Sequence, residues 1–440
     1  MLPRAGTAVA LRAVAMVWLT AAFVLASTPS PLDLSTLTPG ASLSPGVWHF
    51  APDLQELRAR VVAARSDADR AKLLPNPSAD LAVGTIPVGP LNPPDLKDPL
   101  LNVPNVSAGV SVLLELGKRS PRQRSTSETA RAVSLDAVEQ LRQRVLALQS
   151  AIADVAVAEV RVATLQELAS DAEGLAQLQR ARADKGDSSS LDADRAQLEQ
   201  EATRALLGDA IESVQSALRS CTSLAGVQCL PFADASKAAA WLESDVATGP
   251  ELKRRPDVRS LEASARAAEA ALELAHNRAV PDLTVRAGYV HDRFVISGNQ
   301  QNSLFVGVSV PMPFFDHGQA DARAATEAQR AAETAKERLL ATAPVLLQRL
   351  DEEESHLEAR HRRIHTQALP LGASVVERLN AAVTRGAAPI QELLLARRSY
   401  AELRLLATEL DRTAYGLRLE KARLTGAPIE LPEELSDANE

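Results

Sequence analysis

Two hydrophobic periods alternate along the chain, and each predicts a different secondary structure. In residues 106–114, 282–290 and 303–310, apolar residues alternate with small or polar ones, which is the period of a β-strand. In residues 138–165, apolar residues are mostly three and four positions apart, and in residues 403–424 a leucine recurs every seven positions. This is the heptad pattern of long helices that pack side by side. The sequence therefore predicts short strands combined with long helices.

The two kinds of segment occur twice, which indicates an internal duplication. Gly109 and Gly307 each begin the tetrapeptide GVSV, and they lie 198 positions apart. The sequences around Gly186 and Gly386 also resemble each other, at a separation of 200 positions. Two matches at almost the same separation are not expected by chance. The pattern predicts a tandem repeat of two strands and a long helical hairpin.

Gly186 and Gly386 mark the predicted reversal of each helical hairpin. Glycine tolerates the positive φ angle with which many helices end. After the first reversal, the serines at 188–190 and Asp192 offer oxygens that can cap the next helix. After the second reversal, Pro389 suits the start of a helix.

Proline distinguishes the two long helical tracts. Residues 120–183 contain no proline beyond Pro121, so a continuous helix would be about 95 Å long. The corresponding tract at 316–385 contains Pro344 and Pro370. Because proline removes a backbone donor and clashes with the preceding turn, a kink or break is expected at each.

The strand segments place apolar residues on one face and small or polar residues on the other. In residues 303–310, Val306 and Val308 alternate with Gly307 and Ser309. This alternation fits a membrane barrel with a wet lumen, and it equally fits a half-buried sheet with one solvated face. Four strands cannot close a barrel, and an open sheet edge is not viable in lipid. The membrane interpretation therefore requires several chains to share one barrel.

The first 26 residues have the pattern of a secretory signal peptide. Arg4 and Arg12 precede an apolar run that ends at Ala26, and polar residues follow. The alternative is a membrane anchor, but the run is shorter than the roughly 20 residues that a spanning helix needs. We therefore expect an exported protein, in which Cys221 and Cys229 form a disulfide. The other interpretation, a metal pair, would require further ligands nearby.

Composition excludes several classes of function. Aromatic residues make up only 3% of the 440 residues, so a core built around large rings is not expected. The net charge is −8 and no basic stripe is present, which argues against a nucleic-acid partner. The motifs of nucleotide binding, serine hydrolases and zinc proteases are absent from the sequence. The sequence thus predicts no enzyme and no cofactor.

Three histidines on the second helical tract are the candidate metal ligands. His361 and His365 have the spacing at which two imidazoles on a helix can share a metal, and His356 lies nearby. The surrounding run 351–363 is strongly charged, which favours a solvated helix face over a metal site. No metal site is predicted here.

The motifs that flank the strand pairs resemble those of the outer membrane efflux protein (TolC-like) family. They precede the first strand, follow the second, open the second repeat and follow the fourth strand. The matching segments are Leu74-Pro75-Asn76-Pro77, Glu115-Leu116-Gly117-Lys118-Arg119, Arg255-Pro256-Asp257-Val258 and Val310-Pro311-Met312-Pro313-Phe314-Phe315-Asp316 with Gly318-Gln319. Together with the two reversals, they look most like the heavy-metal cation efflux (CzcC-like) branch. The resemblance extends from about residue 51 to residue 424.

The resemblance implies a fold that is mainly α with membrane β. Three copies would form a homotrimer with a twelve-stranded outer-membrane β-barrel, continued by a periplasmic α-barrel of twelve helices. The implied divisions are a signal peptide (1–26), an N-terminal part of the equatorial region (27–73), a first strand pair (74–119), a first hairpin (120–226), an equatorial loop (227–250), a helix that opens the second repeat (251–279), a second strand pair (280–316), a second hairpin (317–425) and a C-terminal tail (426–440).

The family also implies a function, namely a passive export duct for heavy-metal cations or small toxic compounds. The implied partners are outer-membrane lipid, a periplasmic adaptor and an inner-membrane pump of the RND type that supplies the energy. The reversals would form the periplasmic tip, which places the adaptor contact and the aperture at Gly186, Ser190, Asp192, Gly386 and Glu392. The alternative is a periplasmic adaptor, but an adaptor has one hairpin and this chain has two in tandem.

Asp192 and Glu392 each follow a reversal glycine by six residues. In a trimer, six such carboxylates near one constriction would attract cations and repel anions, and Arg195 and Arg385 would offset their mutual repulsion. The alternative is that both residues only cap their helices or interact with the helix dipole.

Overall fold

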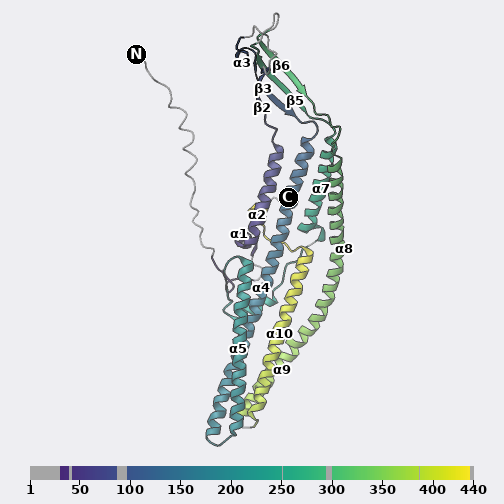
Figure 1. Cartoon of the computed structure of the whole chain (residues 1–440). Coiled ribbons are helices and arrows are strands. Elements are labelled where there is room, and N and C mark those ends of the chain that lie inside the picture. Colours follow the sequence, from purple (N-terminus) through teal and green to yellow (C-terminus); the bar gives the residue numbers. More distant parts are fainter. Residues whose placement is uncertain are drawn as a thin grey trace, which may run out of the picture.

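The computed structural model describes residues 30–38, 42–86, 97–249, 251–293, 300–385 and 387–436. The predicted signal peptide lies outside these residues. The described chain forms one long body, with a β-sheet at one end and helical hairpins that extend away from it (Figure 1). The mainly helical fold that the sequence predicts is confirmed.

The elements form two similar runs, each with a helix, two strands and a long hairpin. The first run contains α2 (Pro52–Lys72), β2 (Ser78–Gly84), α3 (Pro99–Asn102), β3 (Asn105–Leu114), α4 (Arg119–Asp184) and α5 (Ser190–Ala225). The second run contains α7 (Pro256–Asn277), β5 (Leu283–His291), β6 (Asn302–Ser309), α8 (Gln319–Arg363), a π-helical segment (Ile364–Ala368), α9 (Leu369–Thr384) and α10 (Ile390–Thr425). The other elements are β1 (Leu32–Asp33), α1 (Ser44–Phe50), β4 (Cys229–Leu230), α6 (Ala235–Glu243), a 3-10 turn (Leu252–Arg254) and α11 (Glu433–Ser436).

The four long strands form one antiparallel sheet in the order β2-β3-β5-β6. The central pair, β3 and β5, joins the two repeats, and its register sets Val110 opposite Ala287. Ala287 in turn lies opposite Val306 of β6. Directly opposed residues of antiparallel strands point to the same face, so the apolar positions of all four strands align on one face. The predicted alternation is therefore continuous across the sheet.

Glycine on the other face makes room for an aromatic ring. Gly109, Gly288 and Phe305 are aligned across β3, β5 and β6. A Cβ atom at Gly288 would lie 2.6 Å from Cε1 of the Phe305 ring, and one at Gly109 would lie 3.2 Å from Cζ. The glycine of the repeated GVSV segment is thus needed in the first repeat for packing.

A junction of polar residues connects the sheet to the helices. Gly117 has a φ of +71°, which lets the chain turn between β3 and α4. Lys118 pairs with Asp282 at 2.8 Å, and Asp282 also accepts a hydrogen bond from the backbone of Leu116. On the other side, a Cβ atom at Gly318 would lie 2.1 Å from the carbonyl oxygen of Ala275. The motif residues around the strands therefore fix the angle between sheet and helices.

Helix α4 lies at the centre of the packing. It is a single helix of 66 residues, about 100 Å long, and it contacts α2, α5, α6, α7 and α10. Leu141 and Ile152 of α4 are completely buried, and Trp48 of α1 and Phe232 belong to the same core. The continuous first helix that the proline-free sequence predicts is confirmed.

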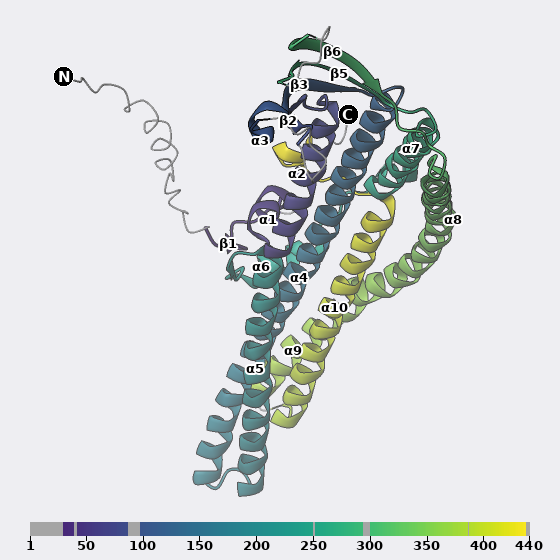
Figure 2. The same cartoon turned by 45° about the horizontal axis from the view of Figure 1, so that its top comes forward.

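The second helical tract responds differently at the two prolines where the sequence predicts a kink or a break. Helix α8 continues through Pro344 without interruption and bows as a whole (Figure 2). A bend is enough, because proline at this position removes only one backbone hydrogen bond. The helical hydrogen-bond pattern changes instead at residues 364–368, a π-helical segment directly before Pro370. The expected disruption is therefore present near Pro370, and a break at Pro344 is not.

Two buried arginines attach the end of α10 to the rest of the chain. Arg142 of α4 donates to the carbonyl of Ala422 at 3.2 Å, and Arg255 donates to the carbonyl of Leu424 at 2.8 Å. Both carbonyls belong to the last turn of α10, where the helix runs out of its own donors. The Ala422 carbonyl also accepts the N–H groups of Gly426 and Ala427, the latter at 2.9 Å, so Arg142 adds a side-chain donor to a backbone cap. The Arg255-Pro256-Asp257 motif thus joins the start of α7 to the end of α10.

The predicted disulfide is present and lies in the middle of the molecule. Cys221 near the end of α5 is bonded to Cys229 of β4, which pairs in parallel with β1. Gly226 lies between them with a φ of +74° and caps α5. Among the described helices, no segment is both long and apolar enough to cross a bilayer.

Candidate functional site

The first helix reversal has the conformation that its glycine predicts. Gly186 has a φ of +77°. Its N–H donates to the carbonyl of Ala183 at 3.0 Å, and the next N–H, of Asp187, donates to Arg182 at 2.9 Å. These bonds satisfy the last carbonyls of α4, as in a glycine-terminated helix. The positive φ of Gly186 is confirmed.

The cap of α5 is Ser189, one of the three serines that the sequence offers for this role, so that prediction is confirmed. Its Oγ accepts a hydrogen bond from the N–H of Leu191 at 3.1 Å. Ser190 is exposed and begins the helix, and Asp192 lies in the first turn. Asp192 is therefore not the cap, which corrects that interpretation and leaves its carboxylate available to other side chains.

The second reversal is described on both sides of Gly386, which itself lies outside the described residues. Arg385 ends α9 and is exposed, and Pro389 is the residue that caps α10. Glu392 lies in the first turn of α10 and is exposed. The predicted place of Pro389 at a helix start is confirmed.

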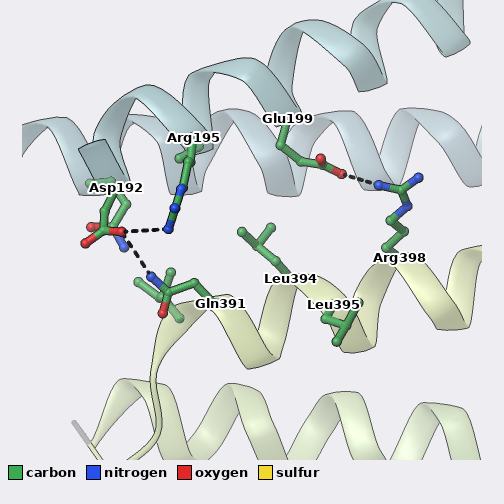
Figure 3. Close-up of a pocket in the computed structure, with 10 residues that line it drawn as sticks. Asp192, Arg195, Glu199, Gln391, Leu394, Leu395 and Arg398 are labelled. Carbon is green, nitrogen blue, oxygen red and sulfur yellow. Dashed lines mark hydrogen bonds and ion pairs between the residues drawn. The ribbon is translucent and has the colours of Figure 1, made fainter. Parts of the chain in front are cut away.

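The start of α5 and the start of α10 lie side by side (Figure 3). Gln391 of α10 donates to Asp192 of α5 at 3.5 Å, and Arg195 pairs with Asp192 at 3.8 Å. Seven residues further along each helix, Arg398 of α10 pairs with Glu199 of α5 at 3.5 Å. These contacts are long, so each is weak in water.

A groove runs between these two helix starts. Its volume is about 250 Å³, and Leu394 and Leu395 of α10 point into it between the polar contacts (Figure 3). Leu395 remains largely exposed, as does Leu198 of α5. The tip thus combines acidic groups with apolar side chains that the single chain leaves uncovered.

Further from the tip, a row of arginines holds α10 against α4. Arg397 pairs with Asp171, and Arg404 pairs with Glu167. Arg412 continues the row and pairs with Asp154 at 2.7 Å. Sequence reasoning missed these pairs because the partners are more than 200 positions apart. The available signal was the seven-residue spacing of Arg397 and Arg404, which places both on one stripe of α10.

The sheet carries a second surface that is unusual for a protein in water. Its aligned apolar face is uncovered, and Leu304 and Val306 of β6 are 84% and 80% exposed. On the opposite face, Ser111 donates to Asp80 at 3.2 Å and Arg286 lies beside Gly307. One face is thus apolar and exposed, and the other carries mainly small and polar residues, with the Phe305 ring packed over its glycines. Continuous apolar patches of this kind mark contact with a membrane or a partner.

Comparison with known proteins finds similarity both in sequence and in fold. Residues 50–227 match the family model described as outer membrane efflux protein. The cobalt-zinc-cadmium resistance protein CzcC of Cupriavidus metallidurans is 30% identical over 222 residues, which are 49% of this chain and 51% of that protein. The match therefore spans about half the length of this curated relative.

Solved structures extend the likeness in fold to nearly the whole chain. A membrane protein from Pseudomonas aeruginosa has a TM-score of 0.67 and 18% identity, with 93% of this chain and 96% of that chain covered. The outer membrane protein VceC of Vibrio cholerae has a TM-score of 0.66 and 17% identity, with 88% and 96% covered. CusC has a TM-score of 0.63 and 16% identity, with 91% and 98% covered. The resemblance that the sequence motifs predict is thus confirmed: the chain is similar to outer membrane efflux proteins in sequence over residues 50–227, and it is similar in fold to the solved structures over most of its length.

Proposed function

We propose that three copies of this chain form an outer-membrane exit duct of a tripartite efflux system. The observation that carries the proposal is the four-stranded sheet, whose apolar face is exposed and whose edge strands, β2 and β6, each pair on one side only among the described residues. An open apolar sheet in water is prone to aggregation, and an open edge in lipid is costly. Three such sheets joined edge to edge would close a twelve-stranded ring with its apolar face toward lipid.

Exposed apolar side chains on the helices also support assembly of three copies. On α5, Leu191 and Leu198 are exposed and seven residues apart, the spacing of a seam between helices. On the other hairpin, Val345 of α8 and Leu371 of α9 are also largely exposed. Neighbouring copies would cover these side chains in an α-barrel of twelve helices. The assembled duct would lie in the outer membrane and extend into the periplasm.

The proposed cargo is heavy-metal cations or small toxic compounds, because the relative named above is a cobalt-zinc-cadmium resistance protein. A periplasmic adaptor would bind the helix reversals, and an inner-membrane pump of the RND type would supply the energy. The uncovered groove between α5 and α10 is a suitable adaptor contact. The duct itself would be passive, with no cofactor.

The strand faces provide the first test. Val306→Arg places a cation on the proposed lipid face, which costs about 2–4 kcal/mol near the midplane. We expect fewer heat-modifiable trimers in the outer-membrane fraction. Gly307→Asn, on the proposed lumen side, is the matched control and should be tolerated better. Equal tolerance of both substitutions, or recovery of the wild-type chain as a periplasmic monomer, would contradict the proposal.

The acidic tip provides the second test. In a trimer, Asp192 and Glu392 would supply six carboxylates near the aperture. We expect Asp192→Asn combined with Glu392→Gln to reduce cation selectivity in single-channel recordings while trimers still form. Efflux of metal cations is measured in the same strains. Unchanged selectivity with only a lower heat stability would place the gate elsewhere.

A further inference from the structure

Two histidines and an aspartate form a compact cluster at the place where α8 passes into α9. His361 is in the last turn of α8, His365 is in the π-helical segment, and Asp411 is on α10. The ligand atoms of the three side chains lie within 4.8 Å of one another. Nε2 of His361 is 2.7 Å from Oδ1 of Asp411, and Nε2 of His365 is 3.2 Å from the same oxygen.

The two imidazoles lie together because they are four residues apart, at the point where α8 passes into a π-helical segment. In the π-helical segment, the N–H of Leu369 donates to the carbonyl of Ile364, five residues earlier, where an α-helix would bond four residues earlier. The rings of His361 and His365 are stacked, with centroids 4.1 Å apart and planes inclined by 21°. Both Nε2 atoms therefore face the Asp411 carboxylate. Such π-helical insertions are frequent at functional sites.

One of these nitrogens has no hydrogen bond. Nε2 of His365 is buried and, among the described residues, lacks a hydrogen-bond partner in spite of the carboxylate at 3.2 Å. A buried polar atom without a partner is costly, and an unseen ligand is one explanation for it. The exposed fractions of the side chains are 37% for His361, 28% for His365 and 13% for Asp411. The cluster is thus sheltered and still open to solvent on one side.

The surroundings suit a metal site better than a solvated helix face. Ile364, Ala407 and Leu410 form a small apolar cluster beside it. An apolar shell limits access by water and strengthens metal–ligand interactions. Most of the charged run at 351–363 is exposed, as the sequence predicts, and His356 is among its exposed residues. His361 lies on the other side of the helix, where α10 supplies the carboxylate that the sequence pattern does not contain.

We propose that His361, His365 and Asp411 bind a divalent transition-metal ion of the zinc class, such as Zn²⁺ or Co²⁺. Two imidazoles and one carboxylate are ligands that these ions prefer, and three protein ligands leave a position for water or an exchanging ligand. Tetrahedral ligands at Zn²⁺ distances are about 3.4 Å apart. The two nitrogen–oxygen separations here are 2.7 and 3.2 Å, and all three ligand atoms lie within 4.8 Å of one another, so side-chain rotations would bring them to that spacing. Bound metal would join the α8–α9 junction to α10.

The test is metal binding by the purified full-length chain, freed of any affinity tag. Titration calorimetry with Zn²⁺, and Co²⁺ absorption in the visible range, should report one ion per chain. His361→Gln, His365→Gln and Asp411→Asn should each weaken binding by about 100-fold or more, since each removes a ligand. His356→Gln is the matched control, because this histidine is on the same helix but exposed, and it should bind as the wild type does.

Metal should also raise the unfolding temperature of the wild type and of His356→Gln, and leave that of the three ligand variants unchanged. Helical circular dichroism without metal verifies that each variant is folded. The proposal is overturned if the wild type binds no ion, or if the three ligand variants bind as tightly as the control. None of these measurements requires the chain to act as a channel, so they stand apart from the proposed function.

Discussion

The two halves of this duplicated chain use the same pattern in different ways. In the first half, α4 buries 24 of its 66 residues, including large side chains such as Leu141 and Ile152. In the second half, α8 buries only three of its 45 residues, all of them alanines, and α9 buries none of its 16. A duplicated sequence has therefore produced one helix that is packed within the chain and one that is largely uncovered.

The difference follows from the neighbours of each helix. Helix α4 contacts helices on several sides, while α8 packs against α7 and α10, and α9 against α10 (Figure 2). Ala325 and Ala332 of α8 are seven residues apart and allow close approach along one stripe only. The other stripes of α8 and α9 carry apolar side chains in the open. The comparison teaches that the long helix of the first half is held within the core of the chain, whereas the corresponding helices of the second half leave apolar surface uncovered.

The largest effect is expected where the packed half contains charge. Arg142 and Glu139 of α4 form a buried ion pair, with nitrogen–oxygen distances of 2.9 and 2.6 Å. Arg142→Leu would leave Glu139 buried with only the amide of Gln143 as a donor, and would remove the side-chain hydrogen bond to the Ala422 carbonyl, which keeps its backbone partners Gly426 and Ala427. We expect a loss of about 3–5 kcal/mol in the free energy of unfolding.

A double variant separates the two causes of this loss. Arg142→Leu with Glu139→Leu removes the unpaired charge and should recover most of the stability, because two apolar residues can replace a buried ion pair. The measurement is denaturant unfolding followed by helical circular dichroism. A double variant as unstable as Arg142→Leu would assign the loss to the Ala422 contact.

The next prediction compares the loss of one apolar side chain in each half. Ile152→Ala in α4 should cost about 2–5 kcal/mol, because it leaves a cavity in a completely buried position. Leu346→Ala in α8 removes a side chain that is 42% exposed, and should cost roughly 0.5 kcal/mol or less in the monomer. In the trimer the cost at Leu346 should rise if a neighbouring copy covers it. The same small cost in monomer and trimer would place Leu346 on a free surface.

Sequence reasoning succeeded where the determining interactions are local. The alternation around Val306 and the positive φ of Gly186 depend on a few adjacent residues, and the structure agrees with both. The sequence did not reveal that α4 is buried and α8 is largely exposed. Both segments carry a helical pattern, and burial depends on which distant elements pack nearby. Asp411 was missed for the same reason, since it lies 50 positions from His361 and reaches it only through the packing of α10 on α8.

The smallest expected effect depends on pH and belongs to the packed half. Burial raises the pKa of the Glu159 carboxyl above its ordinary value of 4.5, and hydrogen bonds from the N–H groups of Phe232 and Ala233 lower it without cancelling the rise. The folded chain therefore retains this proton at pH values where the unfolded chain has lost it. Because the unfolded state binds fewer protons, this group makes stability fall as the pH rises from about 4.5 through the raised pKa. Because the side chain at position 159 cannot titrate in the Glu159→Gln variant, the unfolding temperature of the variant, relative to that of the wild type, should increase as the pH rises across this window. A difference between the two proteins that stays constant with pH would show that burial does not perturb this carboxyl.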